Sequence, residues 1–597
     1  MIHLVCFGAC VCLILVLMYI SGSTPIKTYE LGDSDCYMRL VRVRELYNTG
    51  KWYDAVISRS NAPYGERLHW TRPFDVLLMA GAVPLSLFTD FETALFWWAV
   101  IISPVLLITT IVALYWSAKS ILNDDGPFLI CFVFVLQMII LAYYQAGRPD
   151  HHSFLIFLFV VSIGLSIRMI LKPFNAVLCY MAGAVGALSI WVSVESLLPV
   201  CVIIVALGIL WILKNGDFAK KSFHYSLALF VFTALSLILE RPRHDLAARQ
   251  FDSLSIVHLS VLGFVAAFWI ISSIFGRQRK IFQRTSHRFY FALAGVAAIA
   301  IATSLCFPKF FNGPFADVDP RIVPIWLSKV SEVQPLISGS DSLIIPIQLF
   351  GSILLLLAFL FNLLLKDRHC ESRDGWLFIS FAAVAFVLIS LYQIRWSAYA
   401  QILLIIPMTG LMVSLRRKGP QIGLLKTLKN VSIVLVFSLG FLLLGLLADV
   451  IFKKGDSRES RSGVSLIGMC DYLNDAEMLR QRNLRILTHI DFGAEILYRT
   501  QHEVIGTPYH RNSSGILDTY NLMTANKEEK ALEIIQKREV DLILLCLKSS
   551  ESAVYSKLEQ TSTFYQRLLE DAIPSWLRKV ELPSDLSSSF ILFETVE

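Results

Sequence analysis

A short polar segment with metal-binding potential, Gly147-Arg148-Pro149-Asp150-His151-His152, separates two long apolar runs at 127–144 and 153–170. Membrane spans rarely contain a carboxylate beside two imidazoles unless these groups take part in chemistry or bind an ion. Asp150 and His152 lie two residues apart and could offer one oxygen and one nitrogen ligand to a divalent cation. The alternative is structural, with Asp150 as the N-cap of the following helix and the histidines solvated nearby.

A pair of carboxylates, Asp33 and Asp35, follows the first apolar run of the chain. Two acidic side chains one residue apart, just outside a membrane span, are a common source of hard oxygen ligands for Mg²⁺ or Mn²⁺. The same spacing also occurs in plain turns. The pair alone therefore does not indicate a metal site, and its interpretation depends on its position relative to Asp150 and His152.

The composition identifies a polytopic membrane protein. Of the 597 residues, 55% are hydrophobic, and the mean hydropathy is +0.60, which excludes a soluble protein. The basic clusters are short loop segments that membrane topology explains, so we expect no nucleic-acid partner. The 11 cysteines show no zinc-type spacing, and nothing in that spacing decides whether Cys470 and Cys546 pair.

About thirteen apolar runs are long enough to cross a membrane, since one crossing needs about 20 apolar residues. They are 4–22, 94–115, 127–145, 153–171, 175–193, 197–213, 222–239, 255–275, 289–306, 343–365, 375–393, 397–415 and 431–453. The first run has no Lys or Arg before it and is interpreted as an uncleaved span. A further run at 76–88 is too short, so we expect it to lie in the interface or to re-enter.

The charge distribution orients these spans. With the N-terminus inside, the most basic segments of the membrane region, 276–288 and 416–418, face the cytoplasm, as the positive-inside rule requires. The Arg-rich segment 240–249 then lies outside, against the rule. Both polar segments described above fall on the outer face, and this common sidedness favours a metal site over a simple helix cap.

A polar C-terminal region follows the last run. Strand-like segments at 484–487, 503–505, 540–547 and 590–593 alternate with helical patterns at 475–482 and 527–537. This alternation predicts a small α/β domain. We therefore expect a transmembrane catalytic domain at 1–453 and an extracytoplasmic α/β domain at 454–597.

Three motifs in order along the chain carry a family resemblance. Asp35-x-Tyr37 follows the first span, Pro63-x-Gly65 precedes a His-Trp and Phe-Asp segment, and Gly147-x-x-Asp-His-His follows the third span. This order resembles the catalytic subunit of oligosaccharyltransferases, with motifs most like those of archaeal and bacterial single-subunit forms. The resemblance implies the GT-C fold with thirteen spans and glycan transfer from a polyprenyl-phosphate-type carrier to asparagine. It also implies that Asp35 is a catalytic carboxylate and that Asp35, Asp150 and His152 bind the metal.

The resemblance extends to two further residues. Val330-Ser331-Glu332, in a long Pro/Gly-containing loop at 307–342 that suits a mobile lid, is similar to a family motif whose glutamate reaches the acceptor nitrogen. Glu332 is thus a catalytic candidate, with a solvated loop acid as the alternative. Arg395 matches a family arginine near the carrier phosphates, and an arginine is the natural bidentate partner of phosphate. A snorkelling structural arginine is its alternative.

At the acceptor site the sequence departs from the family pattern. The family motif Trp-Trp-Asp-Tyr-Gly, which reads the Ser/Thr of the acceptor sequon, matches His489-Ile490-Asp491-Phe492-Gly493. Asp491 and Gly493 are kept and Phe492 replaces tyrosine, but both tryptophans are absent, and with them the indole donors. The candidates for binding the acceptor are therefore His489, Asp491, Phe492 and Gly493. The acceptor they bind need not contain a sequon.

The predicted function is metal-dependent glycosyl transfer at the outer membrane surface, with Mn²⁺ or Mg²⁺ as cofactor. The partners expected are a polyprenyl-linked sugar donor, membrane lipids and an acceptor, either protein asparagine or a lipid or envelope polysaccharide. A transporter or flippase for a lipid-linked sugar is the alternative from another class. Scarce intramembrane charges and the lack of evident inverted repeats argue against it.

Overall fold

The fold is taken from a computed structural model that describes most of the chain. The described residues are 8, 25–278, 280–337, 343–365, 372–418, 423–452, 464–475, 483–549, 551–552, 555 and 563–596. The predicted first span, 4–22, lies outside them except for one residue. The predicted domain boundary at 453/454 also lies outside them.

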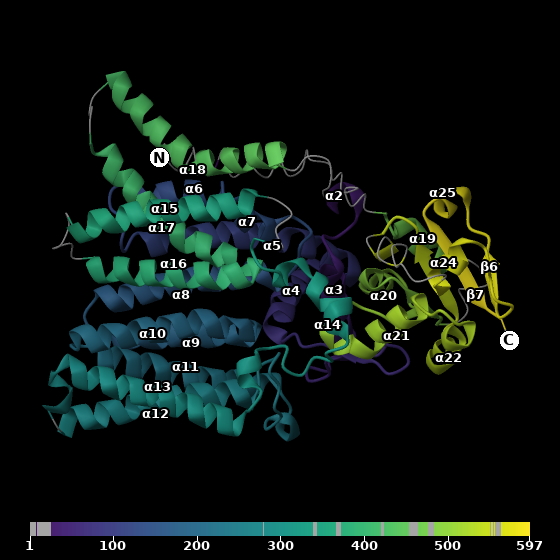
Figure 1. Cartoon of the computed structure of the whole chain (residues 1–597), viewed down its shortest axis with the longest axis horizontal. Helices are drawn as coiled ribbons and strands as arrows, with labels where there is room; N and C mark the ends of the chain where they lie inside the picture. Colours follow the sequence, from purple (N-terminus) through teal and green to yellow (C-terminus); the bar gives the residue numbers. More distant parts are fainter. Residues whose placement is uncertain are drawn as a thin grey trace.

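A bundle of apolar helices forms the larger part of the molecule. Within the described residues, 10 helices are long and apolar enough to cross a membrane. They are α5 (Phe91–Ala118), α8 (His151–Leu171), α10 (Leu197–Lys214), α11 (Phe218–Glu240), α12 (Ile256–Gln278), α13 (Thr285–Cys306), α15 (Ile344–Leu365), α16 (Arg373–Tyr392), α17 (Ser397–Arg416) and α18 (Gly423–Phe452). Figure 1 shows these helices side by side, with α12 and α13 at one edge and α18 at the other. The polytopic membrane architecture predicted from hydropathy is confirmed.

Three predicted runs differ from straight spans. The run 127–145 forms a broken pair, α6 (Gly126–Phe134) and a second piece from α7 (Met138–Leu141) through η1 (Ala142–Tyr144), bent by 67°. The run 175–193 forms a shorter helix, α9 (Ala176–Val192). The run 76–88 falls mainly in the 14-residue helix α4 (Arg72–Leu85), a length that agrees with the expectation that it does not span.

A polar residue, Gln137, lies at the break between α6 and α7. Its contribution is lost when hydropathy is averaged over the whole run. Backbone groups that leave a helix inside a membrane need partners within the protein. Gln137, at the break, donates its side-chain amide to the Val133 carbonyl at 2.9 Å. Its side-chain oxygen accepts a hydrogen bond of 2.9 Å from Gln401 on α17. The two glutamines thus supply side-chain hydrogen bonds at the bend.

The helix α3 (Ser34–Thr49) lies between the bundle and the C-terminal domain (Figure 1). Asp33 caps its N-terminus by accepting from the Cys36 amide at 3.1 Å. The helix is fixed to α4 by the fully buried Asp75, which lies 2.6 Å from Arg42 Nε and 3.1 Å from Arg72 Nη1. A buried carboxylate needs such charge-paired partners, so α3 and α4 form one rigid unit.

The C-terminal domain is built on a mixed five-stranded sheet in the order β4-β3-β5-β7-β6. The strands are β3 (Arg485–Thr488), β4 (Glu503–Val504), β5 (Leu542–Cys546), β6 (Leu577–Val580) and β7 (Phe590–Thr595). The pairs β3–β4 and β3–β5 are parallel, and β7 is antiparallel to both β5 and β6. Its helices are α19 (Ile467–Asp475), α20 (Gly493–Arg499), α21 (Ser513–Met523), α22 (Glu528–Arg538), α24 (Phe564–Leu569) and α25 (Ser584–Ser587). This confirms the predicted sheet-containing domain, to which the structure adds β6.

The loop predicted as a lid is packed against this domain in its described part, 307–337. It contains η5 (Phe310–Asn312), α14 (Ile322–Ile325), η6 (Leu327–Lys329) and η7 (Ser331–Val333). Ile322 is fully buried and packs with Ile490 and Ile516 of the C-terminal domain. The remaining residues of the predicted loop, 338–342, lie outside the described part.

The C-terminal domain is also joined to the first external segment by backbone pairing. Val504 of β4 donates its amide to the Arg59 carbonyl at 2.8 Å and accepts from the Ala62 amide at 3.0 Å. The Arg538 guanidinium, fully buried, donates to the Ala62 carbonyl at 2.9 Å. The segment 59–62 therefore continues the sheet beyond β4. Backbone hydrogen bonds join the two domains at this edge of the sheet.

A buried glutamate, Glu66, lies at this junction. Its Oε2 accepts from Ser60 Oγ and from Thr507 Oγ1, both at 2.6 Å. The side chain is only 1% exposed. Burial outweighs the two hydroxyl donors and raises the pKa of Glu66 to about 7.

The raised pKa predicts that the domain junction weakens as pH rises. The folded protein retains a proton on Glu66 that the unfolded chain releases near pH 4.5, so the stabilisation is complete below that pH and is lost as pH rises through about 7. The loss amounts to at most about 3 kcal/mol. Glu66→Gln should remove this decline in melting temperature between pH 4.5 and 7, as followed by tryptophan fluorescence in detergent. The exposed Glu581→Gln serves as control, and an unchanged slope for Glu66→Gln contradicts the assignment.

Candidate metal centre and transfer site

A backbone crossing brings the two polar segments together. The Gly32 amide donates to the Gly147 carbonyl at 2.9 Å, and the Gly147 amide donates to Val100 of α5, also at 2.9 Å. Gly147 has φ +75°, and a Cβ there would lie 2.0 Å from Pro25 Cγ. Only glycine fits this position, so the crossing is fixed by residue type.

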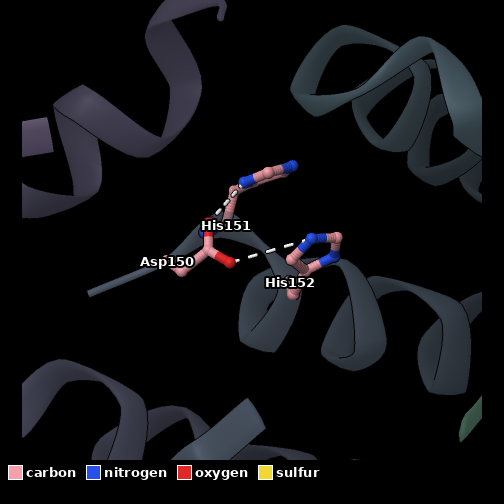
Figure 2. A group of neighbouring side chains, drawn as sticks. All are labelled: Asp150, His151 and His152. Atoms are coloured by element: carbon pink, nitrogen blue, oxygen red, sulfur yellow. Dashed lines mark hydrogen bonds and ion pairs between the residues drawn. The ribbon is translucent and has the colours of Figure 1, made fainter. Parts of the chain in front are cut away.

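The predicted metal-binding segment lies at the start of α8, and Figure 2 shows its three side chains. Asp150 is 3% exposed and caps α8 by accepting from the His151 amide at 2.7 Å. Its Oδ1 lies 2.6 Å from His151 Nδ1, and its Oδ2 lies 3.7 Å from His152 Nε2. One ligand atom from each of the three residues falls within 4.8 Å of the others. The helix-cap and metal-site interpretations are therefore compatible, since different oxygens serve each.

Glu332 joins this cluster from the loop that follows α13. Its Oε2 lies 3.5 Å from His152 Nε2, and its Oε1 lies 3.5 Å from Arg148 Nη2. The loop is held near α17 because the Ile394 amide donates to the Gln334 carbonyl at 2.8 Å. Burial alone would raise the pKa of Glu332, but the neighbouring His152 and Arg148 lower it to about 2. Glu332 is thus held as a carboxylate.

Asp35 completes a group of four carboxylates. It is half-buried in the first turn of α3, and burial raises its pKa well above the usual range, with further increases from the nearby Asp33, Asp150 and Glu332. Arg148 Nε lies 3.8 Å from Asp33 Oδ2 and offsets part of this repulsion. Carboxylates crowded beside an imidazole are a donor set that suits a divalent cation. The residues present therefore fit the predicted cofactor.

Arg395, the predicted phosphate ligand, lies at the turn η8 (Ile394–Trp396). Its Nη1 lies 2.5 Å from Glu195 Oε1, in the matching turn η2 (Val194–Ser196), and its Nε donates to Gln393 Oε1 at 3.2 Å. Glu195 thus orients Arg395 at the same end of the bundle as the candidate metal cluster.

The predicted acceptor motif follows strand β3 and contacts the segment that contains Asp35. The Asp491 carbonyl accepts from Ser34 Oγ at 2.7 Å, directly beside Asp35 in the chain. Ser549 Oγ pairs with Nδ1 of the fully buried His489 at 2.5 Å, and among the described residues His489 Nε2 has no hydrogen-bond partner. Phe492 stacks on His489 with ring centroids 5.7 Å apart.

The last residue of this motif, Gly493, is required for packing. A Cβ there would lie 2.2 Å from the Gly506 carbonyl. The motif is thus placed beside Asp35 by its backbone, with His489 and Phe492 at the positions of two aromatic residues in the family pattern.

Sequence reasoning missed three residues of the site. Arg148 and His151 contact the carboxylates directly, and both stand in the polar segment that drew attention to the site. Arg39 is 1% exposed, lies 3.9 Å over the Trp70 ring, and is one turn after Asp35 on the same face of α3. An arginine at i+4 from a candidate ligand was a signal that could have identified it.

Comparisons with known proteins support the fold. No family model matches the chain. A curated protein of Archaeoglobus fulgidus, dolichyl-phosphooligosaccharide-protein glycotransferase 1, is 30% identical over 141 residues. That match covers 24% of this chain and only 22% of the relative, so it is confined to less than a quarter of either protein.

Solved structures extend the likeness to nearly the whole chain. The apo oligosaccharyltransferase of A. fulgidus matches with a TM-score of 0.72 at 14% identity, over 98% of this chain and 80% of that one. The archaeal oligosaccharyltransferase AglB of the same organism, in complex with an inhibitory peptide and a dolichol-phosphate, matches with a TM-score of 0.70 at 13% identity, over 94% and 77%. The chain therefore has the GT-C fold of the archaeal oligosaccharyltransferases, as its motifs predicted.

The geometry predicts unequal roles for the two histidines in metal binding. His152 Nε2 lies between Asp150 and Glu332, whereas His151 Nδ1 is already occupied by Asp150 Oδ1. His151→Ala should lower Mn²⁺ affinity about 10- to 100-fold, as expected for a partner that orients a ligand, and His152→Ala should lower it further. Electron paramagnetic resonance titration of the purified protein measures both. The exposed His244→Ala is the control, and a larger loss for His151→Ala would reverse the assignment.

Proposed function

We propose that the chain is a metal-dependent membrane glycosyltransferase that moves a sugar or oligosaccharide from a polyprenyl-(pyro)phosphate carrier to protein asparagine. One observation carries this proposal. Segments more than 100 residues apart bring Asp150, His152 and Glu332 together at a single end of the helix bundle, and the crossing of Gly32 with Gly147 brings the segment of Asp35 to the same place. The fold on which this cluster stands is that of the archaeal oligosaccharyltransferases.

The proposed cofactor is Mn²⁺ or Mg²⁺, held by Asp35, Asp150 and His152. Such an ion supplies positive charge that stabilises a leaving phosphate. A divalent metal is supported by the cluster of Asp150, His151 and His152, whose ligand atoms lie within 4.8 Å of one another, and by a solved A. fulgidus oligosaccharyltransferase structure in complex with Zn and sulfate. The choice between Mn²⁺ and Mg²⁺ rests on the mixed oxygen and nitrogen donors, which favour Mn²⁺.

The remaining residues act on the two substrates. Asp35 and Glu332 would accept hydrogen bonds from the acceptor amide and orient its nitrogen for attack. Arg395, aligned by Glu195, would bind the carrier phosphate, for which its planar guanidinium is suited. Arg148 keeps Glu332 and Asp33 in place, since it contacts both.

The comparison supports a proposal for the partners, and the loop charges support one for the orientation. Solved relatives contain a dolichol-phosphate with an inhibitory peptide, and a tethered acceptor peptide with the NVT sequon. We propose equivalent donor and acceptor classes here, with membrane lipids around the bundle. We also propose that the site and the C-terminal domain face the outside of the membrane, because basic loops predict that orientation.

A second acceptor is supported by one specific observation. His489 and Phe492 occupy a motif in which the family has two tryptophans and a tyrosine, so the indole donors that would hold a sequon hydroxyl are absent. The same donor chemistry could therefore act on a lipid or envelope polysaccharide. The donor half of the site does not depend on this choice.

Labelled-sugar transfer tests both versions. Asp150→Ala and Glu332→Gln should each reduce transfer at least 100-fold, because each removes a group that holds the metal or the acceptor. Label is counted in delipidated protein and in the lipid and polysaccharide fraction of cells producing each variant. Loss from protein, traced to asparagine, supports the first acceptor, and loss from the other fraction supports the second.

The control for this experiment is Asp317→Ala, an exposed carboxylate in the same loop as Glu332, paired with Lys309 at 2.8 Å. It should transfer at the wild-type rate. Wild-type rates for Asp150→Ala and Glu332→Gln would exclude glycosyl transfer at this site and leave a flippase as the better account.

The pairing of Glu195 with Arg395 predicts a donor-specific defect. Glu195→Gln keeps the side-chain shape but removes the charge that aligns Arg395 at 2.5 Å. The KM for the lipid-linked donor should rise about tenfold, equivalent to about 1.4 kcal/mol, with little change in the KM for the acceptor. Steady-state kinetics in detergent measures both constants. Asp374→Asn, which removes an ion pair with Lys214 at the opposite end of α16 from Arg395, is the control. An unchanged donor KM for Glu195→Gln would show that the Glu195–Arg395 ion pair has only a structural role.

A further inference from the structure

A polar cleft lies apart from the metal cluster, between α3 and the C-terminal domain. Its volume is about 670 Å³, within the range of ligand-binding clefts. Its lining includes Arg44, Glu45, Asn48, Arg59, Asn483 and Tyr498. Since an α-helix rises 1.5 Å per residue, Arg44 to Asn48 lie roughly 14–20 Å along α3 from Asp35. The cleft is therefore a separate feature of the outer end of the molecule.

The walls of the cleft are held by arginines that cap α20. Arg44 donates to the carbonyls of Leu497 and Tyr498, each at 3.0 Å. Arg59 donates to Leu497 at 2.8 Å and to Thr500 at 2.9 Å. The last carbonyls of a helix require such partners, and these bonds join the two domains across the cleft. The cleft is thus formed before any ligand binds.

Hydrogen bonds of this kind also limit the class of ligand that the cleft can bind. The third arginine, Arg499, lies 2.6 Å from Glu495 and donates to the Tyr29 carbonyl at 2.8 Å. Recognition of a phosphate needs guanidinium donors that point at it. Because the guanidiniums of Arg44, Arg59 and Arg499 are engaged with the protein, the cleft is poorly suited to an anionic ligand.

The groups that face the opening are of mixed polarity. Asn48 and Asn483 are exposed, and their amides each offer two donors and one acceptor oxygen. Glu45 adds a half-buried carboxylate, and Tyr498 adds an aromatic ring with a hydroxyl. Hydroxyl groups both donate and accept hydrogen bonds, so a polyhydroxylated ligand matches this combination better than an anion or an apolar chain.

We propose that this cleft binds an oligosaccharide, holding sugars distal to the transferred linkage. The inference rests on the proposed function, which brings glycans to the same end of the bundle. Two sources share this chemistry: the outer sugars of the lipid-linked donor, and a glycan acceptor of the envelope type. Occupation by the second source would favour the polysaccharide acceptor over asparagine.

A double variant, Asn48→Ala with Asn483→Ala, tests the proposal in the full-length protein. Both amides are exposed, so folding should be preserved, and melting temperature confirms it. Asn521→Ala, an exposed amide of α21 outside the cleft, is the matched control. Saturation-transfer NMR and calorimetry use three probes: oligosaccharides released by mild acid from the cells' lipid-linked fraction, fragments of their envelope polysaccharide, and inorganic pyrophosphate.

The expected result is that one oligosaccharide pool binds the wild-type protein and the control, and that the double variant loses at least fivefold in affinity. Whichever pool binds identifies the source. Unchanged pyrophosphate binding in the double variant agrees with an oligosaccharide cleft. Pyrophosphate affinity that falls in the double variant, or no binding of either pool to the wild-type protein, overturns the proposal.

Kinetics separates this inference from the proposed function. For a full-length donor or a glycan acceptor the KM should rise about fivefold in the double variant, while kcat and transfer of a single sugar stay at the wild-type level. If the wild-type protein binds an oligosaccharide pool but transfers no sugar, the proposed function is wrong and the proposal that the cleft binds an oligosaccharide is supported. If transfer occurs and its KM is unaffected by the double variant, the cleft proposal fails alone.

Discussion

The hydrogen bond from Gly32 to the Gly147 carbonyl is the constraint on which the site depends. It joins two external segments that are separated in sequence by α3, α4 and the first spans of the bundle. Gly147 can make this contact only because it has no Cβ, since Pro25 fills the space where one would be. Asp33 and Asp35 follow one side of the crossing, and Asp150 follows the other. A shift of the crossing would move the carboxylates as a group.

Holding these carboxylates together costs free energy, and the structure shows how the protein offsets it. Arg148 lies between Asp33 and Glu332, and His152 lies between Asp150 and Glu332. Behind them Arg39 is buried over Trp70 and contributes a further positive charge. Like charges at such separations destabilise one another strongly where water is excluded. A site that keeps several carboxylates despite this cost is prepared for a cation.

Much of the site could be predicted because its residue types are unusual for their surroundings. Asp150 and His152 stand out against apolar runs, and the order of motifs led to Asp35 and Glu332. The partners of these residues were harder to predict, because which arginine or histidine contacts a carboxylate depends on how loops pack. Glu195 shows this: only the meeting of two short turns, η2 and η8, makes it the partner of Arg395. The placement of Asp491 beside Ser34 likewise depends on packing between domains.

The fold was predicted to a similar degree, with misses that have physical causes. Hydropathy found the bundle but treated 127–145 as one span, because a single Gln137 hardly changes the mean over 19 residues. Strand β6 (Leu577–Val580) carries Arg578 and Lys579 and is buried only in part, so its sequence lacks the apolar alternation of the other strands. The pairing of segment 59–62 with β4 was not visible either, since its bonds join residues about 440 apart in the chain.

That long-range pairing has a consequence for how the protein is made. A ribosome delivers the first external segment, with Ser60 and Ala62, long before it delivers Val504 and Thr507. Until then the segment lacks the strand that satisfies its backbone, and Arg44 of α3 and Arg59 of the segment lack the carbonyls that accept their hydrogen bonds. Contacts of such sequence separation form late in folding. The packing of the segment 59–62 is therefore completed only after the sheet of the C-terminal domain has been synthesised, about 440 residues further along the chain.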